Sequence, residues 1–203
     1  MPVLETPATI LTLVALLAYL LGSVPFGLVI TRALGLGDLR QIGSGNIGAT
    51  NVLRTGHKGA AAATLILDAA KGAVAVLLAR GLVAEDAAQL AGLMAFLGHL
   101  WPVWLRFRGG KGVATFLGTL IALYWPVGLG VCATWVVVAL VSRISSLAAL
   151  FAAAASTFWM VGLGQGRMLV LGAVLTVLVY VRHAANIKRL REGTEPKIGL
   201  GKG

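Results

Sequence analysis

The chain has 203 residues, of which 58% are hydrophobic, with 27 glycines and a formal net charge of +10. This composition leaves little material for a separate soluble domain, so we expect one all-α polytopic membrane domain over residues 1–203. The 17 Lys and Arg residues are scattered at the ends of hydrophobic segments, which argues against nucleic-acid binding and for anionic lipid or phosphate ligands. The single cysteine, Cys132, excludes a disulfide framework and a cysteine-based metal site.

Hydrophobic segments alternate with short polar loops along the chain. The first segment, about Ala8 to Leu34, is too long for a cleaved signal peptide and follows no cationic region, so we expect it to be the first membrane span. Further spans are predicted at Ala60 to Leu78, Ala87 to Leu105, Ser145 to Leu163 and Met168 to His183.

The segment from Val113 to Val141 is longer than one span and shorter than two full ones. It is interrupted by Trp125-Pro126 and by Gly128-Leu129-Gly130, which favours two short helices. With two helices here, most Lys and Arg residues fall on one side of the membrane, as they do in cytoplasmic loops. We therefore expect seven transmembrane helices, with the N-terminus outside and the C-terminus in the cytoplasm.

Three glycine-rich polar motifs fall on the predicted cytoplasmic face: Gly43 to Arg54, Gly98 to Thr115, and His183 to Glu195. Glycines let backbone N–H groups approach an anion, and a helix N-terminus adds further donors. Arg54 can bind phosphate through two hydrogen bonds, whereas Lys111 offers a compact charge. Convergence of the three motifs would make a site for a doubly charged ligand.

Two sequence patterns in these motifs could suggest nucleotide binding. Gly43, Gly45 and Gly48 match GxGxxG, but they follow a predicted span instead of a strand of a βαβ unit. Lys111 lacks the glycine spacing and the following Ser or Thr of a phosphate-binding loop. We therefore expect neither a dinucleotide fold nor a nucleotide motor.

Some charged and polar residues have a structural interpretation. Asp68 and Lys71 lie three residues apart within the second predicted span, so we expect them to form an ion pair. We expect His99 to position its loop by hydrogen bonding, and His57 to be a loop residue without a special role. His183 and Asn186, also three apart, would share one face of a continuing helix.

Together, GSGNIGATNVLR at Gly43 to Arg54, GHLWPVWLRFRGGKGVAT at Gly98 to Thr115, and HAANIKRLREGTE at His183 to Glu195 resemble one family. It is the bacterial membrane acyl-phosphate:glycerol-3-phosphate acyltransferases, known as PlsY, and the resemblance covers essentially the whole chain. The HxxxxD signature of other glycerol phosphate acyltransferases is absent, since Ala62, Trp104 and Lys188 follow the three histidines at that spacing.

This resemblance implies an enzyme of the bacterial inner membrane with its active site facing the cytoplasm. It would transfer a fatty acyl group from acyl phosphate to the 1-position of glycerol 3-phosphate, giving lysophosphatidic acid and inorganic phosphate. This is the first acylation of phospholipid biosynthesis. The expected partners are these two substrates and the lipid bilayer, with no nucleic acid, and we expect a monomer. No cofactor or metal is expected, because no His, Asp and Glu cluster has ligand spacing.

The resemblance also assigns residues to the site. The residues expected to act in catalysis are Ser44, Arg54, Lys111, His183 and Asn186. The residues expected to bind substrate are Gly43, Gly45, Asn46, Thr50, Asn51, Gly109, Gly110 and Gly112. In this assignment Ser44 and the N–H groups of residues 43–46 hold the acyl phosphate, and Lys111 with the backbone of residues 109–112 neutralises phosphate charge. Arg54 binds the phosphate of glycerol 3-phosphate, and His183 and Asn186 orient the acceptor.

The proton acceptor and the function class have alternatives. His183 could act as general base, or the acyl phosphate could itself take the acceptor proton, which we favour because the donor is already activated. A phosphate or organic-anion transporter is the main alternative function, since short helices and the buried Asp68 and Lys71 would suit a midplane site. Polar motifs on one face argue against it, and their chemistry argues against a noncatalytic lipid-binding scaffold.

Overall fold

The computed structural model describes residues 2–198, and every regular element among them is helical. The predicted all-α class is therefore confirmed. The helices form two compact units, residues 2–123 and the chain from residue 124 onward, and each unit is described by itself. The expectation of a single domain stays a prediction.

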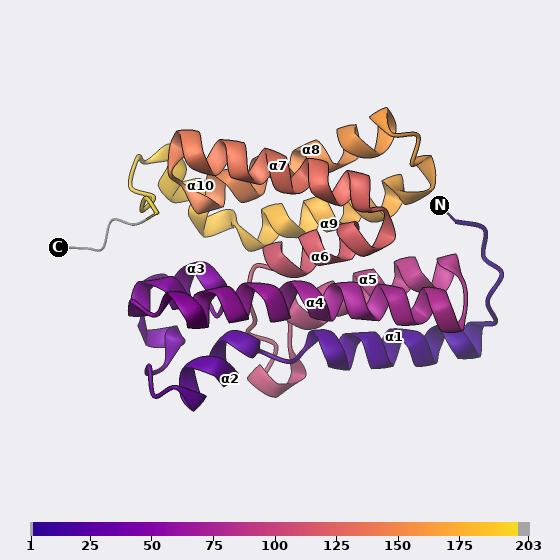
Figure 1. The fold of residues 1–203 in the computed structure, drawn as a ribbon, viewed down its shortest axis with the longest axis horizontal. Coiled ribbons are helices and arrows are strands. Elements are labelled where there is room, and N and C mark those ends of the chain that lie inside the picture. The colour runs from indigo at the N-terminus through magenta and orange to yellow at the C-terminus, as the bar shows by residue number, and fades with distance from the viewer. Residues whose placement is uncertain (1, 199–203) are drawn as a thin grey trace. The chain divides into compact units, whose positions relative to one another are not determined.

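The first unit contains six α-helices and three short 3-10 turns. Its helices are α1 (Ala8–Gly22), α2 (Phe26–Ala33), α3 (Ala49–Val52), α4 (Lys58–Leu82), α5 (Glu85–Leu100) and α6 (Val113–Leu123). The turns are η1 (Leu39–Gln41), η2 (Leu53–Thr55) and η3 (Val103–Leu105). The long helix α4 packs against both α5 and α6, and α5 packs against α1 (Figure 1).

Small residues let these helices approach closely. A Cβ atom at Gly22 in α1 would overlap the backbone of Ala95 in α5, and one at Gly118 in α6 would overlap the backbone of Ala69 in α4. Backbone contact of this kind is typical of helices that pack within a bilayer, where small residues replace the apolar driving force available in water.

The first predicted span, Ala8 to Leu34, is broken into α1 and α2. The break covers Ser23 to Pro25, where the proline has no N–H to continue the helical hydrogen bonding. Within the break, the carbonyl of Val24 accepts hydrogen bonds from the N–H of Phe26 at 3.2 Å and from Nζ of Lys71 at 2.9 Å. The break therefore provides a partner for a buried charge of α4.

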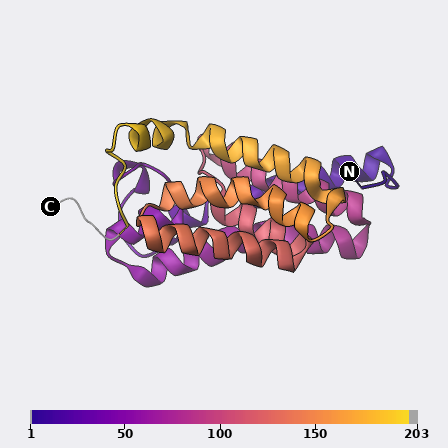
Figure 2. The ribbon, with the colours of Figure 1, turned by 90° about the horizontal axis from the view of Figure 1, so that it is seen from above.

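The second unit contains α7 (Trp125–Ser142), α8 (Ser145–Gly162), α9 (Leu169–Arg182) and α10 (Ala184–Arg191), with the 3-10 turn η4 (Gly166–Met168). Helix α8 packs against both α7 and α9; the three appear in orange to yellow in Figure 2. Small residues are buried in α8, where they allow close contacts with neighbouring helices: Ala148, Ala149, Ala152, Ala153 and Ser156.

The interrupted region from Val113 to Val141 forms two helices, as predicted, but they differ in length. Helix α6 has 11 residues and α7 has 18, and the break falls at Tyr124 because Pro126 occupies the first turn of α7. Gly128 and Gly130 lie inside α7 and do not interrupt it. Gly130 instead lets the ring of Trp159 approach the helix backbone.

Five helical segments in the described range are long and apolar enough to cross a membrane. They are Ala8–Ala33, Lys58–Leu82, Glu85–Leu105, Trp125–Ser142 and Ser145–Gly162. A sixth results if Gly166–Arg182 and Ala184–Arg191, which meet at a bend of 62°, count as one broken span. Helix α6 is apolar but shorter. Helices thus occur at all predicted span positions, while the count of seven crossings and the orientation of the termini stay predictions.

Candidate functional site

The first glycine-rich motif is folded around the side chain of Asn51, which is 1% exposed. Its amide nitrogen donates to three backbone carbonyls at 2.8 to 2.9 Å, those of Leu39, Ile42 and Asn46. Its amide oxygen accepts the backbone N–H of Ser44 at 3.2 Å. These contacts use both the amide nitrogen and the amide oxygen, so Asn51 holds the loop together, while its expected substrate contact stays a prediction.

A small hydrophobic core packs against this loop. Leu39, Ile47 and Val52, all nearly fully buried, pack with Leu28 of α2. Leu105 of η3 packs against the same cluster. The motif is therefore attached both to the first apolar segment and to the turn of the second motif.

Ser44 and Arg54 are exposed at the surface of this loop. Gly43 has a φ of 54°, in the left-handed region that glycine adopts without strain. A Cβ atom at Gly43 would lie 2.6 Å from Nη1 of Arg54, so the guanidinium group rests directly against this backbone. The fold therefore brings the hydroxyl of residue 44 and the charge of residue 54 to the same exposed part of the loop.

Two of the backbone N–H groups expected to bind phosphate have protein partners. The N–H of Ser44 donates to Asn51, and that of Gly45 donates to the carbonyl of Ile42 at 2.9 Å. These two N–H groups therefore hold the loop together, and the expected phosphate cradle over residues 43–46 stays a prediction. Thr50 is exposed, and Asn46, four residues earlier, is half-buried.

The second motif forms a tight turn between α5 and α6. The N–H groups of Gly109 and Gly110 donate to the carbonyls of Leu100 and His99, each at 3.1 Å. These two glycines therefore anchor the turn to the end of α5, and the expectation that their backbone helps neutralise phosphate stays a prediction. A side chain at Gly110 would overlap the ring of His99, so only glycine permits this contact.

Lys111 is half-buried and lies immediately before α6. The next residue, Gly112, has a φ of 82° and packs so closely on Phe96 of α5 that a Cβ atom would overlap the ring. Its carbonyl accepts the N–H of Phe116 in the first turn of α6. The position of Lys111 is thus fixed on both sides, by the anchored glycine turn and by the start of a buried helix.

A buried charge cluster lies behind this turn. Nζ of Lys71 lies 2.9 Å from the Asp68 carboxylate, which confirms the predicted ion pair. Nδ1 of His99 lies 3.6 Å from the same carboxylate, and the hydroxyl of Thr115 donates to the backbone carbonyl of Asp68 at 2.8 Å. His99 therefore joins the buried pair on one side to the glycine turn on the other.

The third motif begins at the bend between α9 and α10. His183 is 2% exposed and Asn186 is 3% exposed. Nδ1 of His183 is 2.8 Å from the carbonyl of Val179, so the ring turns back along α9. The helix does not continue straight through His183, as assumed when the two residues were expected to share a helix face, but bends there by 62°.

Glu195 joins the third motif to α8 through three hydrogen bonds of its carboxylate, although sequence reasoning gave it no role. Its carboxylate accepts hydrogen bonds from Asn186 at 2.5 Å, Arg189 at 2.6 Å and Ser146 at 2.7 Å. Burial opposes the charge of Glu195, but these hydrogen bonds outweigh it and hold its pKa below the ordinary value. The chain continues to Ile198, whose N–H donates to the carbonyl of Arg143.

With this geometry described, comparison with known proteins identifies the family. The family model described as glycerol-3-phosphate acyltransferase matches residues 12–193. The chain belongs to this family.

Relatives resemble it over nearly the full length. The glycerol-3-phosphate acyltransferase of Cereibacter sphaeroides is 67% identical over 199 residues, covering 98% of this chain and 95% of the relative. That of Ruegeria pomeroyi is 65% identical over 199 residues, covering 98% of each chain.

Two solved structures have the same fold. One is the crystal structure of PlsY (YgiH), an integral membrane glycerol 3-phosphate acyltransferase, in the glycerol 3-phosphate form, with a TM-score of 0.88 and 38% identity. It covers 93% of this chain and 96% of that one. The lysophosphatidic acid form of PlsY has a TM-score of 0.87 and 36% identity, with 93% and 95% covered. Together with the apolar helices, this likeness makes the chain a multi-pass integral membrane protein.

The family's glycine-rich motifs are distributed over the two units. Those with Ser44, Arg54 and Lys111 lie in residues 2–123, and those with His183 and Asn186 lie in the unit that begins at residue 124. Within the first unit, the contact of Leu105 with the core under Asn51 joins the first two motifs. The convergence of all three motifs into one site stays a prediction.

Proposed function

We propose that the protein transfers a fatty acyl group from acyl phosphate to the 1-position of glycerol 3-phosphate, producing lysophosphatidic acid and inorganic phosphate. The observation that supports this most directly is the family membership over residues 12–193, combined with the presence of all three polar motifs. We infer that the reaction occurs at the cytoplasmic side of the bacterial inner membrane, where a water-soluble acceptor and a lipid-like donor can meet.

Arg54 and Lys111 are proposed to hold the two phosphate groups. Arg54 lies exposed against the backbone of Gly43, where a guanidinium can form two parallel hydrogen bonds with phosphate. Lys111 is held in place at the start of α6 and supplies a compact charge. The hydroxyl of Ser44, beside Arg54 on the loop, is proposed to donate to the acyl phosphate.

Asn51, Gly45, Gly109 and Gly110 are proposed to act through the shape of the two loops. Their polar backbone or amide groups are bonded within the protein, so they position other groups and do not themselves contact substrate. Rigid positioning of this kind is valuable for a reaction between two anions, because alignment can supply a large part of the rate enhancement.

His183 and Asn186 are proposed to orient the glycerol 3-phosphate hydroxyl. The carboxylate of Glu195 accepts a hydrogen bond from the amide nitrogen of Asn186. This contact fixes the orientation of the amide, with its oxygen directed away from the carboxylate. No hydrogen-bond partner in the described chain satisfies this buried oxygen. A hydroxyl donor from the acceptor substrate would satisfy it.

In the proposed step, the acceptor hydroxyl oxygen attacks the carbonyl carbon of the acyl phosphate. A new ester C–O bond forms, the anhydride C–O bond to phosphate breaks, and the departing phosphate takes the hydroxyl proton. Because the donor is a mixed anhydride, no covalent enzyme intermediate is needed. The enzyme aligns the reactants and offsets the repulsion of their charges.

A reconstitution assay tests the proposal. The purified protein in detergent should release inorganic phosphate from acyl phosphate only when glycerol 3-phosphate is present, and lysophosphatidic acid should appear in equal amount. Absence of turnover, together with uptake of glycerol 3-phosphate or phosphate into proteoliposomes, would instead support the anion transporter.

A further inference from the structure

Four arginines line one hollow in the first unit. The hollow has a volume of about 470 Å³ and is lined by Arg32, Arg40, Trp104, Leu105, Arg106 and Arg108. It includes none of the residues proposed to bind the substrates. Arg32 comes from the last turn of α2, Arg40 from η1, and the other two arginines from the turn that follows η3.

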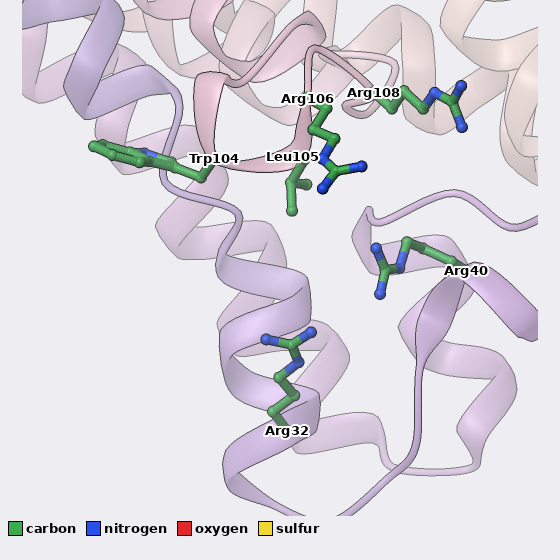
Figure 3. Close-up of a pocket in the computed structure, with 6 residues that line it drawn as sticks. All are labelled: Arg32, Arg40, Trp104, Leu105, Arg106 and Arg108. Carbon is green, nitrogen blue, oxygen red and sulfur yellow. The ribbon is translucent and has the colours of Figure 1, made fainter.

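The guanidinium groups converge on this hollow. Figure 3 shows those of Arg32, Arg40 and Arg106 pointing into the same space, whereas Arg108 points outward at the rim. Of these four arginines, only Arg40 has an ion-pair partner among the described residues. The partner is Asp38, with 2.6 Å between Nη2 of the arginine and Oδ2 of the aspartate. The four arginines that line the hollow are therefore accompanied by one carboxylate, and a bound anion would offset the excess charge.

The turn that supplies Arg106 has an uncommon backbone. Arg106 and Phe107 both have positive φ, 51° and 62°, a region that few residues with a Cβ atom adopt. Hydrogen bonds from the N–H of Phe107 to Pro102 and from that of Arg108 to Leu105 maintain this conformation. The turn directs Arg106 into the hollow and leaves Phe107 58% exposed.

The hollow lies at the ends of two apolar segments. Arg32 is the penultimate residue of the candidate span Ala8–Ala33, and Arg106 directly follows Glu85–Leu105. Charges at the end of a span lie at the depth of lipid headgroups. Trp104, which is 61% exposed beside the hollow, is the type of residue that anchors proteins at this depth.

We propose that this hollow binds the phosphate of an anionic lipid headgroup, at a site separate from the one that binds the substrates. Arginines that only determine membrane topology would need no common orientation. Here three guanidinium groups from three chain segments face one space of a size typical for ligand sites. The proposal does not depend on the acyltransferase reaction.

Lipid retention by the full-length purified protein tests the proposal. Native mass spectrometry from detergent would count the bound molecules of phosphatidic acid, phosphatidylglycerol and phosphatidylcholine. We expect the protein to retain the two anionic lipids about tenfold better than phosphatidylcholine. Equal retention of the three lipids would overturn the proposal.

Paired variants locate the site. Arg32→Gln with Arg106→Gln should remove most of the preference for anionic lipid. Arg167→Gln with Arg191→Gln, which changes the net charge equally at two other exposed arginines, should leave it intact. If both pairs of variants lost the preference for anionic lipid equally, the preference would depend only on the net charge of the protein, and the proposal would be overturned. If the first pair does not fold, Arg32→Lys with Arg106→Lys keeps both charges, and an unchanged preference there would contradict the need for guanidinium groups.

Competition identifies the source of the phosphate. Inorganic phosphate and glycerol 3-phosphate, each added at millimolar concentration, should leave the lipid bound, because the exposed aromatic side chains add contacts that only a membrane-embedded ligand makes. Displacement of the lipid by either compound would show that the hollow takes free phosphate groups and would overturn the assignment to lipid.

Discussion

Lys71 and Asp68 form an ion pair of 2.9 Å in which the two side chains are only 1% and 3% exposed. Three further groups complete the environment of the pair. The carbonyl of Val24 accepts from the ammonium group, the ring of Phe26 lies 5.8 Å from it, and His99 approaches the carboxylate. The pair therefore connects α4 to the break between α1 and α2 and, through His99, to the turn that holds Lys111.

Removal of one partner of this ion pair should lower the stability of the protein more than removal of both partners. Lys71→Met leaves the Asp68 carboxylate buried without its cation, and we expect a loss of about 3–5 kcal/mol in stability. The double variant Asp68→Asn with Lys71→Met should recover part of this loss. Thermal unfolding in detergent measures the relative stability of the variants. If the double variant were less stable than Lys71→Met alone, the two buried charges would not compensate each other.

Asn51→Ala should disable the first motif without preventing membrane insertion. The variant loses the amide that holds three carbonyls and the N–H of Ser44, so Ser44 and Arg54 lose their fixed positions. We expect acyl transfer to fall about a hundredfold. Asn46→Ala keeps the backbone carbonyl that Asn51 uses, so it is the matched control for loop shape in the proteolysis measurement only, because Asn46 is itself expected to bind substrate. Proteolysis within residues 35–57 should increase only for Asn51→Ala.

Ser44→Ala and Arg54→Ala should each strongly reduce the rate of acyl transfer, while the variant proteins insert normally into the membrane. Arg54→Lys separates charge from geometry, because lysine keeps the charge but cannot form the two parallel hydrogen bonds. We expect it to raise KM for one of the phosphate substrates and to retain more activity than Arg54→Ala. Equal activity of Arg54→Lys and the unmodified protein would argue against a bidentate contact.

His183→Gln should preserve the chemical step if the departing phosphate takes the acceptor proton. In single-turnover assays with both substrates bound, we expect a reduction of no more than about tenfold. Complete loss of the chemical step, with both substrates still bound, would establish His183 as the general base and refute the substrate-assisted route.

The contacts of Glu195 predict a dependence of stability on pH. Because the folded protein lowers the pKa of Glu195 below its ordinary value of 4.5, the stabilisation is complete above that value and is lost as pH falls through the lower folded pKa. Glu195→Gln should therefore unfold at a lower temperature than the unmodified protein at pH 7. The difference should shrink as the pH falls below 4.5 and through the lower folded pKa, and a constant difference would contradict a contribution from the charge.

The helices could be predicted from the sequence, but one break was missed and one predicted interruption does not occur. Apolar length located the long helices because burial of continuous hydrophobic surface leaves a pattern in the sequence. The break at Ser23 to Pro25 was missed because the surrounding residues are apolar. The glycines of α7 suggested an interruption, yet Gly130 accommodates Trp159, a contact between segments that are distant in sequence.

The membership of the site stays a prediction, and the structure adds contacts that bear on the role of each candidate residue. The motifs drew attention to Asn51, Gly109 and Gly110, but only three-dimensional contacts reveal that their polar groups are bonded within the protein. Glu195 gave no comparable signal, since its main partners include Ser146, 49 residues away. Polar residues therefore indicate where a site is, and the distribution of their hydrogen bonds indicates what each one does.

The return of the chain to α8 has a practical consequence for expression of the protein. Glu195 and Ile198 attach the segment after α10 to Ser146 and Arg143. An affinity tag or reporter fused directly after Arg191 would remove both attachments and leave the Asn186 amide without its carboxylate partner. Fusion partners at this end should therefore retain the native sequence through Ile198, or be moved to the N-terminus.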